Sequence, residues 1–263
     1  MTDAVGGRVA VVGGSSSGLG YAVAKRLATS GAKVMLVSRS EDRVLKAVDG
    51  IRDAGGGAVS GCVADFSDED SARLVVEATR DAFGPPEIVV ANGGGPPGMP
   101  AMAATASDLE AASRLLLLPV QRLVELTVPQ MQAAGWGRFV AITSIAVRQP
   151  QPGLVLSNAL RAAVTGYLKS VSDEVAADGV TVNTVCPGYT ATDRLGELAA
   201  LVAEREGSSV DEVFAAWAAQ APARRLLRPE EVASAVSFLC SESASGVTGV
   251  ALAVDGGLGR ALI

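Results

Sequence analysis

One stretch decides the fold of this chain: Gly13-Gly14-Ser15-Ser16-Ser17-Gly18-Leu19-Gly20. It follows the short apolar run at residues 8–12 and precedes residues 18–30, whose leucines and valines recur at helical spacing. This order predicts a strand, a tight glycine turn and a helix. Glycines there let the backbone approach a ligand closely, and the helix N-terminus offers free N–H groups to a pyrophosphate. The stretch therefore predicts a dinucleotide-binding turn, with an ordinary Gly/Ser connection as the alternative.

The same alternation of strand and helix continues along the chain. We predict strands at 8–12, 33–38, 58–63, 87–91, 138–143, 180–185 and 250–254. We predict helices at 18–30, 41–54, 68–83, 107–133, 154–177 and 229–240, with an Ala-rich helical insertion at 194–221. Pro119 should interrupt the long helix. Because the strand runs are continuously apolar, the pattern predicts an α/β fold: one doubly wound Rossmann-type domain over residues 1–263, with a seven-stranded parallel sheet flanked by helices.

The composition excludes several classes of function. Hydrophobic residues make up 49% and charged residues 19% of the 263 residues, which excludes a disordered chain. The net charge of −6 argues against a nucleic-acid-binding protein, because phosphate contacts need clustered cations. The chain has no histidine for catalysis, and its three cysteines are scattered without a CxxC pair, so we expect no metal site. No signal-like segment or membrane-length apolar run is visible, which predicts a cytoplasmic protein without membrane contact.

The end of the second predicted strand indicates which dinucleotide binds. An NAD site usually has Asp or Glu here for the ribose 2′-hydroxyl, whereas this chain has Ser38 and Arg39. A hydroxyl followed by a guanidinium suits a 2′-phosphate, which favours NADP(H) over NAD(H), although Arg39 could also be a solvated cation. Asp65, just after the third strand, could accept a hydrogen bond from the adenine amino group. Equally, it could cap the helix that we expect to begin near Asp68.

Motifs along nearly the whole chain resemble those of the short-chain dehydrogenase/reductase family. The matching positions are Gly14-x-x-x-Gly18-Leu19-Gly20, Asp65, Asn92, Gly94, Ser144 after the fifth strand, Pro187-Gly188 with Thr190 and Thr192, and the C-terminal segment 225–257. The resemblance implies a Rossmann-type oxidoreductase with Ser144 in its active site. Together with the arguments above, it places the cofactor contacts at Gly14, Ser16, Ser17, Gly18, Leu19, Gly20, Ser38, Arg39, Asp65, Phe66, Asn92, Gly93, Gly94, Arg161, Pro187, Gly188, Thr190 and Thr192.

The chain departs from the active-site pattern of that family. The family has a proton-donating Tyr about a dozen residues after the Ser and a Lys four residues later, but here the segment reads Ser157-Asn158-Ala159-Leu160-Arg161. A run of leucines at 115–117 stands where the family usually has an Asn. Arg161 could still reach the nicotinamide ribose, because residues four apart share a helix face, but it stays protonated. A serine hydroxyl is far less acidic than a phenol, so a water between Ser144 and Ser157, or a substrate group, could supply the proton.

Other residues should shape the substrate side of the site. Tyr189 should lie near the nicotinamide as a wall of the pocket, or as a proton donor. Arg148 could enter the substrate cleft and favour an anionic or carbonyl-rich substrate, or remain a solvated loop residue. We expect segment 190–221 to be a mobile lid, although its apolar positions also suit plain packing or a subunit contact.

Three functions remain open from the sequence. The first is an NADP(H)-dependent oxidoreductase acting on a carbonyl or hydroxyl group of a small organic substrate, with Ser144, Ser157 and Arg161 as catalytic residues and an altered proton route. The second is a non-redox isomerase, cyclase or dehydratase, and the third is a nucleotide-binding subunit without chemistry of its own. The resemblance also implies a homodimer or homotetramer, with contacts through the helix at 154–177 and the apolar end at 258–263. Packing within one subunit explains both features equally well.

Overall fold

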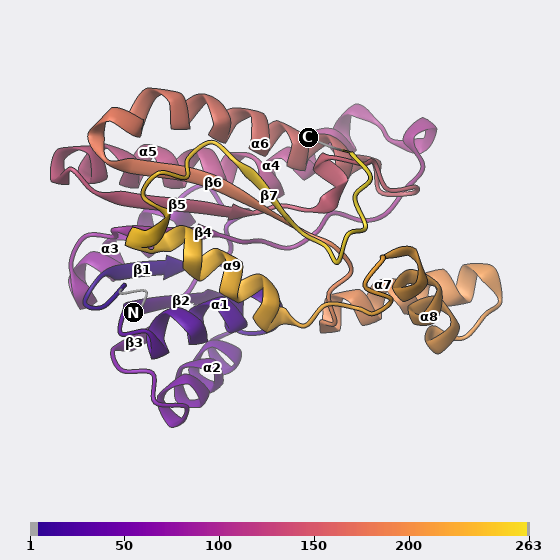
Figure 1. Ribbon diagram of the computed structural model, residues 1–263, viewed down its shortest axis with the longest axis horizontal. Helices are drawn as coiled ribbons and strands as arrows, with labels where there is room; N and C mark the ends of the chain where they lie inside the picture. The colour runs from indigo at the N-terminus through magenta and orange to yellow at the C-terminus, as the bar shows by residue number, and fades with distance from the viewer. Residues whose placement is uncertain (1–4, 262–263) are drawn as a thin grey trace.

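The computed structural model describes residues 5–261, and its core is one parallel sheet (Figure 1). The strands follow the order β3-β2-β1-β4-β5-β6-β7, and every neighbouring pair is parallel. Their bounds are β1 Val9–Val12, β2 Lys33–Ser38, β3 Val59–Val63, β4 Ile88–Ala91, β5 Gly137–Ile142, β6 Val180–Pro187 and β7 Ala251–Val254. This confirms the predicted seven-stranded, doubly wound sheet. Residues 1–4 and 262–263, the last of which end the apolar segment 258–263, lie outside the described part of the chain.

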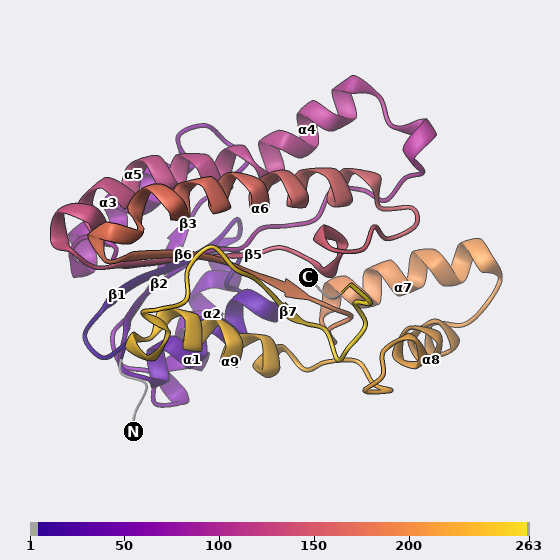
Figure 2. The same cartoon turned by 45° about the horizontal axis from the view of Figure 1, so that its top comes forward.

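Helices cover both faces of the sheet (Figure 2). One face carries α1 (Gly18–Thr29), α2 (Glu41–Asp53) and α9 (Pro229–Cys240), and the other carries α3 (Ser71–Phe83), α5 (Leu118–Ala134) and α6 (Val155–Val175). Successive residues of a strand therefore enter different cores. In β5, Phe139 packs with α5 and α6, whereas Val140 packs with α1 and α9. This double burial explains why the strand sequences are apolar without alternation.

Two predicted helices are divided in the structure. The stretch at 107–133 forms α4 (Ala106–Leu116) and α5, and Pro119 lies in the first turn of α5, as its missing N–H allows. The insertion at 194–221 forms α7 (Asp193–Glu206) and α8 (Val210–Gln220), separated at Gly207, whose φ is 65°. Both α7 and α8 lie beyond the carboxyl ends of the strands (Figure 1).

One helix start was predicted wrongly. The helix expected from about residue 68 begins at Ser71, with Asp70 at its N-cap position. The intervening residues form a turn, because the backbone N–H of Asp68 donates to the carbonyl oxygen of Asp65 at 2.9 Å. The backbone N–H of Ser67 donates to the Asp65 carboxylate at 3.0 Å. Asp65 therefore organises a turn and does not cap α3.

The order of the strands places a crevice at the carboxyl end of β1. β1 pairs with β2 on one side and with β4 on the other. The helix α2 that follows β2 covers one face of the sheet, whereas α5, which comes after β4, covers the opposite face. In open α/β sheets, ligands bind at such a change of direction. The glycine turn after β1, Asn92 after β4 and Ser144 after β5 all lie along this edge.

An ion pair between Arg225 and Glu231 holds the segment that leads from α8 into α9. The Arg225 guanidinium donates to both Glu231 carboxylate oxygens at 2.7 Å, and the backbone N–H of Arg228 donates to one of them at 2.8 Å. The hydrogen bond from Arg225 is the main cause that lowers the pKa of Glu231 from 4.5 to about 2. Because the folded-state pKa is depressed, the carboxylate stabilises the fold above about pH 4.5 and loses this contribution as the pH falls toward 2.

We therefore expect Glu231→Gln to lower the melting temperature at pH 6, and the difference from the wild type to shrink steadily as the pH falls to 3. Thermal unfolding at several pH values between 6 and 3 measures this. Glu230→Gln, at the exposed neighbouring position, is the matched control and should leave the pH dependence unchanged. An equal loss from Glu231→Gln at all pH values would contradict the ionic contribution.

Candidate active site

The glycine turn is held in shape by a buried serine. Ser15 donates from its Oγ to the carbonyl oxygen of Val12 at 2.8 Å, and its Oγ accepts from the backbone N–H of Val37 at 2.9 Å. It thereby ties the end of β1 to β2. Glycine is required at the start of α1, because a Cβ at Gly20 would lie 2.2 Å from the carbonyl oxygen of Gly14. Gly14 itself has a φ of 53°, a conformation that suits glycine.

The first turn of α1 is open to an anion. The Ser17 side chain at the N-cap makes no capping hydrogen bond, and the first turn contains no acidic residue. The N–H groups of residues such as Leu19 therefore face the turn without an intrahelical partner, where the helix dipole adds positive potential. The close-packed glycines and this helix end fit the pyrophosphate of a dinucleotide, as the sequence predicts.

Hydroxyl groups and cations gather beside the turn at the end of β2. Ser38 donates from its Oγ to the Oγ of Ser16 at 2.9 Å. Arg43, in the first turn of α2, donates to the Oγ of Ser17 at 3.0 Å, and Arg39 follows β2 directly. The structure thus bonds Ser16 to Ser38 and Ser17 to Arg43, and places Arg39 directly after Ser38. It adds Arg43, which sequence reasoning missed although it lies four residues after Arg39.

Asp65 forms an ion pair with Arg39. Its carboxylate is 3.7 Å from the Arg39 guanidinium and accepts hydrogen bonds from the backbone N–H and Oγ of Ser67, at 3.0 and 2.8 Å. Burial raises the pKa of Asp65, but the bonds from Ser67 and the charge of Arg39 outweigh it and lower the pKa overall. The carboxylate is therefore ionised and oriented, ready to accept a hydrogen bond.

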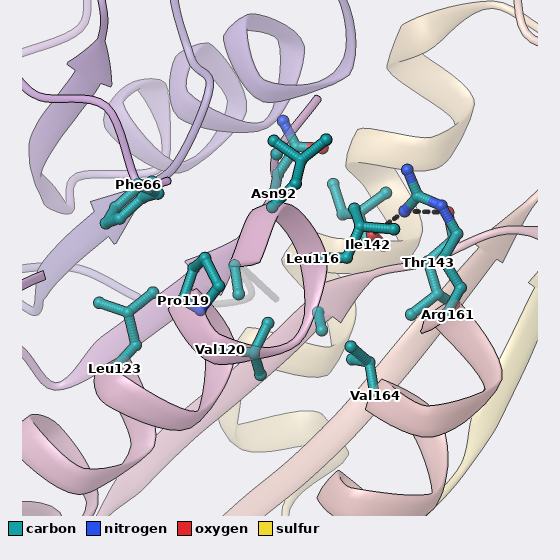
Figure 3. Close-up of a pocket in the computed structure, with 14 residues that line it drawn as sticks. Phe66, Asn92, Leu116, Pro119, Val120, Leu123, Ile142, Thr143, Arg161 and Val164 are labelled. Atoms are coloured by element: carbon teal, nitrogen blue, oxygen red, sulfur yellow. Dashed lines mark hydrogen bonds between the residues drawn. The ribbon is translucent and has the colours of Figure 1, made fainter. Parts of the chain in front are cut away.

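Asn92 connects the end of β4 to the glycine turn. Its Nδ2 donates to the carbonyl oxygen of Gly13 at 3.1 Å. A small cavity of about 40 Å³ begins at this residue and runs between the break of α4 and α5, the ends of β4 and β5, and α6 (Figure 3). Phe66 lies at one end of this cavity and Arg161 at the other, and Gly93 and Leu116 line it between them. Leu115 and Leu116 make part of its wall apolar.

Arg161 is the most strongly held charged group of the site (Figure 3). Its Nε donates to the Oγ of Ser157 at 3.1 Å, and its Nη1 donates to the carbonyl oxygens of Ile142 and Thr143 at 3.1 and 3.0 Å. Its Nη2 donates to the carbonyl oxygen of Gly94 at 3.4 Å. Four of the five guanidinium N–H groups are thus engaged, and the side chain joins β5, α6 and the loop after β4.

The charge of Arg161 persists at neutral pH. Desolvation is the main cause that lowers its pKa from 12.5 to about 10, and nearby Arg194 adds to this effect, whereas Cys186 opposes it. A pKa of about 10 leaves the guanidinium protonated at pH 7. The site therefore has one fixed positive charge beside the Ser157 hydroxyl.

Two serine hydroxyls are available to a ligand. Ser144 caps the short 3₁₀ helix η2 (Ile145–Val147), and its Oγ accepts from the backbone N–H of Ala146 at 3.1 Å. Ser157 lies in the first turn of α6, and its Oγ accepts from Arg161. Because each oxygen acts as an acceptor in these bonds, each O–H remains able to donate to a ligand oxygen.

The end of β6 leads from Pro187 into the α7 region. A Cβ at Gly188 would lie 2.9 Å from the Cα of Asp255, so the chain passes tightly against the segment after β7. Thr190 is buried and donates to the carbonyl oxygen of Gly188 at 3.0 Å. Thr192 caps α7, and its methyl carbon lies 3.4 Å from the Cβ position of Gly18. The start of α7 therefore meets the glycine turn.

The two predicted substrate-side residues have different surroundings. Tyr189 stacks on Trp217 of α8, with ring centroids 4.9 Å apart and an interplanar angle of 4°, and burial raises the pKa of its hydroxyl. The Arg148 guanidinium donates to the backbone carbonyl oxygen of Ala251 on β7, so the structure directs it to that strand. α7 and α8 share a small apolar core around Ala199 and Trp217. The predicted mobility of this segment stays a prediction.

The described residues also limit what else the chain holds. Residues 5–261 contain no cluster of three or more His, Cys, Asp or Glu side chains that could bind a metal ion. Cys62, Cys186 and Cys240 are free and buried. Every helix in the described part of the chain is too short or too polar to cross a membrane.

Comparisons with known proteins agree with this geometry. A family model described as enoyl-(acyl carrier protein) reductase matches residues 14–259. Cis-4-hydroxycyclohexanecarboxylate dehydrogenase of Sinomonas cyclohexanicum is 36% identical over 260 residues, covering 98% of each chain. The 3-oxoacyl-[acyl-carrier-protein] reductase FabG of Vibrio cholerae is 34% identical, covering 96% of this chain and 97% of the relative.

Solved structures of similar proteins give the same result. L-sorbose reductase from Gluconobacter frateurii, in complex with NADPH and L-sorbose, superposes with a TM-score of 0.94 at 33% identity over the whole of both chains. An actinorhodin polyketide ketoreductase with NADPH superposes with a TM-score of 0.91 at 30% identity, covering 99% of each chain. The glycine turn, Asn92, Ser144 and the Pro187-Gly188 segment lie within these matches. The chain belongs to the short-chain dehydrogenase/reductase family.

Proposed function

We propose that this protein is an NADP(H)-dependent oxidoreductase that interconverts a carbonyl and a hydroxyl group of a small organic substrate through a non-standard proton route. The observation that carries the proposal is the open glycine turn flanked by Arg39 and Arg43. Two guanidinium groups and the hydroxyls of Ser16 and Ser38 match a ribose 2′-phosphate, which NAD lacks. The NADPH complexes of the reductases with similar structures support this choice of cofactor.

Different residues around the crevice would hold different parts of the cofactor. The glycine turn and the first turn of α1 would hold the pyrophosphate, and Asp65 would accept from the adenine amino group. Asn92, Gly93 and Gly94 would border the nicotinamide ribose beside the remaining N–H of Arg161. The segment of Pro187, Gly188, Thr190 and Thr192 would cover the nicotinamide. The bound cofactor supplies or accepts a hydride.

The chain's own groups would act on the substrate oxygen. Ser144 would donate a hydrogen bond to the carbonyl oxygen, and Ser157 would position the substrate or a water. Arg161 would stabilise the negative charge that develops on that oxygen, because a fixed charge in a partly dehydrated site costs no reorganisation. Ser157 and Arg161 would thus take the places that Tyr and Lys have in the family. Neither is a good acid, which is why the proton route differs.

The names of the relatives suggest the substrate class. Their names specify a hydroxycyclohexane carboxylate, 3-oxoacyl thioesters on an acyl carrier protein, and L-sorbose. We propose a secondary alcohol or ketone of comparable size, held under α7 and α8 as a lid, in a cytoplasmic homodimer or homotetramer. Chromatography with light scattering would measure the assembly.

The cofactor assignment gives a prediction with a clear magnitude. Arg39→Ala combined with Arg43→Ala should weaken NADPH binding by about 100-fold, because hydrogen bonds to charged groups contribute about 1.5–3 kcal/mol each. NADH binding should change by less than about threefold, since NADH has no 2′-phosphate. Titration of each nucleotide, followed by nicotinamide fluorescence, measures this, with Arg26→Ala on the exposed side of α1 as control. Equal losses for both nucleotides would contradict the 2′-phosphate role.

Activity tests separate the proposed function from its alternatives. Purified protein with NADPH would be offered 4-oxocyclohexanecarboxylate, an acetoacetyl thioester and L-sorbose, and oxidation of NADPH would be followed at 340 nm. Turnover of any of these supports the oxidoreductase. Substrate loss without NADPH oxidation would favour a non-redox enzyme, and tight NADPH binding without any turnover would favour a nucleotide-binding subunit.

A further inference from the structure

Reduction of a carbonyl leaves an oxygen that must receive a proton, and the groups already assigned to the site supply it poorly. Serine hydroxyls such as Ser144 and Ser157 are very weak acids. Arg161 has a pKa of about 10, but it is not free to give up a proton. Three of its N–H groups point at the carbonyl oxygens of residues 142, 143 and 94, which would lose a hydrogen-bond donor if the group were neutral.

Of the three tyrosines in the chain, Tyr189 is the one that follows the carboxyl end of a strand, β6. Tyr21 is on α1 and its hydroxyl lies against Gly50 of α2. Tyr167 packs against the core between α5 and α6, ten residues after Ser157 along α6. Tyr189 follows β6 directly, between the tightly packed Gly188 and the buried Thr190.

The ring of Tyr189 is fixed from two sides. It stacks nearly parallel on Trp217, with centroids 4.9 Å apart. It also packs against the cluster formed by Ile145, Ala221 and Leu258, and Ile145 is the residue next to Ser144. A ring held this way loses little further freedom when it acts.

The hydroxyl of Tyr189 points into the loop that leads to Ser157. It donates to the Oε1 of Gln151 at 3.5 Å. The backbone of Gln151 is held by the side chain of Asn158, through bonds of 3.1 Å to its oxygen and 3.0 Å from its nitrogen. Asn158 is the residue next to Ser157 on α6. The phenol therefore contacts the loop that joins η2, which Ser144 caps, to the start of α6, which carries Ser157.

We propose that Tyr189 is the proton donor for the carbonyl oxygen in the reaction proposed above. As the two electrons arrive at the carbon with the hydride and a C–H bond forms, the phenolic O–H bond breaks and a new O–H bond forms on the substrate. Water then returns a proton to the phenolate, since Tyr189 is only partly buried. In the oxidation direction the same steps run in reverse. This assignment rests on the oxidoreductase function proposed above.

The surroundings of Tyr189 keep it in the donating form. Its ring packs against Trp217 and two apolar clusters, one around Ala199 and one around Ile145, and its hydroxyl bonds to the neutral amide of Gln151. Burial raises the pKa of this phenol, so it is protonated at neutral pH.

Tyr189→Phe tests the assignment, because it removes the hydroxyl and keeps the stacked ring. With NADPH and whichever of 4-oxocyclohexanecarboxylate, an acetoacetyl thioester or L-sorbose the wild type reduces, we expect kcat to fall by about 100-fold or more, as for loss of a general acid. The Kd for NADPH, measured by nicotinamide fluorescence, should stay within about twofold. Tyr167→Phe is the matched control that removes a phenol from the core of the same protein, and its kcat should equal that of the wild type.

The other outcomes overturn the proposal in distinguishable ways. A kcat for Tyr189→Phe within about threefold of the wild type removes Tyr189 from catalysis and leaves the oxidoreductase function standing. Loss of NADPH binding in Tyr189→Phe assigns the hydroxyl to the structure of the cofactor site and not to proton transfer. A wild type that binds NADPH but reduces none of the three probes contradicts the proposed function, and this assignment falls with it.

Discussion

Arg161→Met should lower kcat by about 100- to 1000-fold, as expected when a preorganised charge is removed from the oxygen that it stabilises. The same substitution should lower the free energy of unfolding by about 2–4 kcal/mol. The reason is that the guanidinium donates hydrogen bonds to Ser157, Thr143 and Gly94. Its loss leaves carbonyl oxygens without a donor. Urea denaturation and steady-state kinetics with a ketone that the wild type reduces measure the two effects separately.

Arg161→Lys separates the charge from the hydrogen bonds. An ammonium keeps the positive charge but cannot match the planar fork that reaches β5, α6 and the loop after β4. We therefore expect Arg161→Lys to recover most of kcat at pH 7 and little of the lost stability. A Lys variant that is as slow as the Met variant would show that the fork, not the charge, is what the reaction needs. An unaffected Met variant would remove Arg161 from the mechanism altogether.

The sheet could be predicted because burial on both faces leaves a direct mark on the sequence. β5 is apolar at successive positions since Phe139 and Val140 enter different cores, and no strand on a surface needs that pattern. The break just before Pro119 was also predicted, and it places proline in the first turn of α5, where its missing N–H is tolerated. These features depend on residues close in sequence.

The site was less predictable where it depends on contacts between distant segments. Arg43 lies on a helix whose pattern is that of any solvated face, and only the fold brings it to Ser17. The start of α3 was misplaced because the Asp65 side chain turns the backbone before the helix begins. Arg161 was expected to contact the cofactor, but its four hydrogen bonds to three segments of the protein have no signature in sequence.

This difference bears on how an active site can change without losing its fold. The side-chain amide of Asn92 donates to a backbone carbonyl of the glycine turn, so a change in either disturbs the link between β1 and β4. Ser157 and Arg161 instead bond to each other through side chains on successive turns of α6. The other N–H groups of Arg161 find acceptors among the backbone carbonyls of β5 and of the loop after β4. This pair is therefore able to replace another pair there, provided that a phenol such as Tyr189 takes over the acid role.

The glycine turn gives the prediction with the largest effect on cofactor binding. In Gly20→Ala the new Cβ would lie 2.2 Å from the carbonyl oxygen of Gly14 and 2.8 Å from that of Gly13. Both neighbours are backbone atoms, which cannot turn away as a flexible side chain does. The turn must therefore move, at a cost of about 1–3 kcal/mol in unfolding free energy. The Kd for NADPH should rise by at least about 100-fold, because the shifted carbonyls enter the space that the pyrophosphate needs.

Nicotinamide fluorescence titration and thermal unfolding measure these two losses, and a control glycine shows that they are local. Gly57 lies in an exposed loop before β3, and a Cβ there would meet nothing within 4 Å. Gly57→Ala should therefore leave the Kd for NADPH and the melting temperature unchanged. Gly20→Ala that binds NADPH as tightly as the wild type would mean that the pyrophosphate does not lie on this turn. The assignment of the crevice at β1 as the cofactor site would then be wrong, since every other cofactor contact is placed relative to that turn.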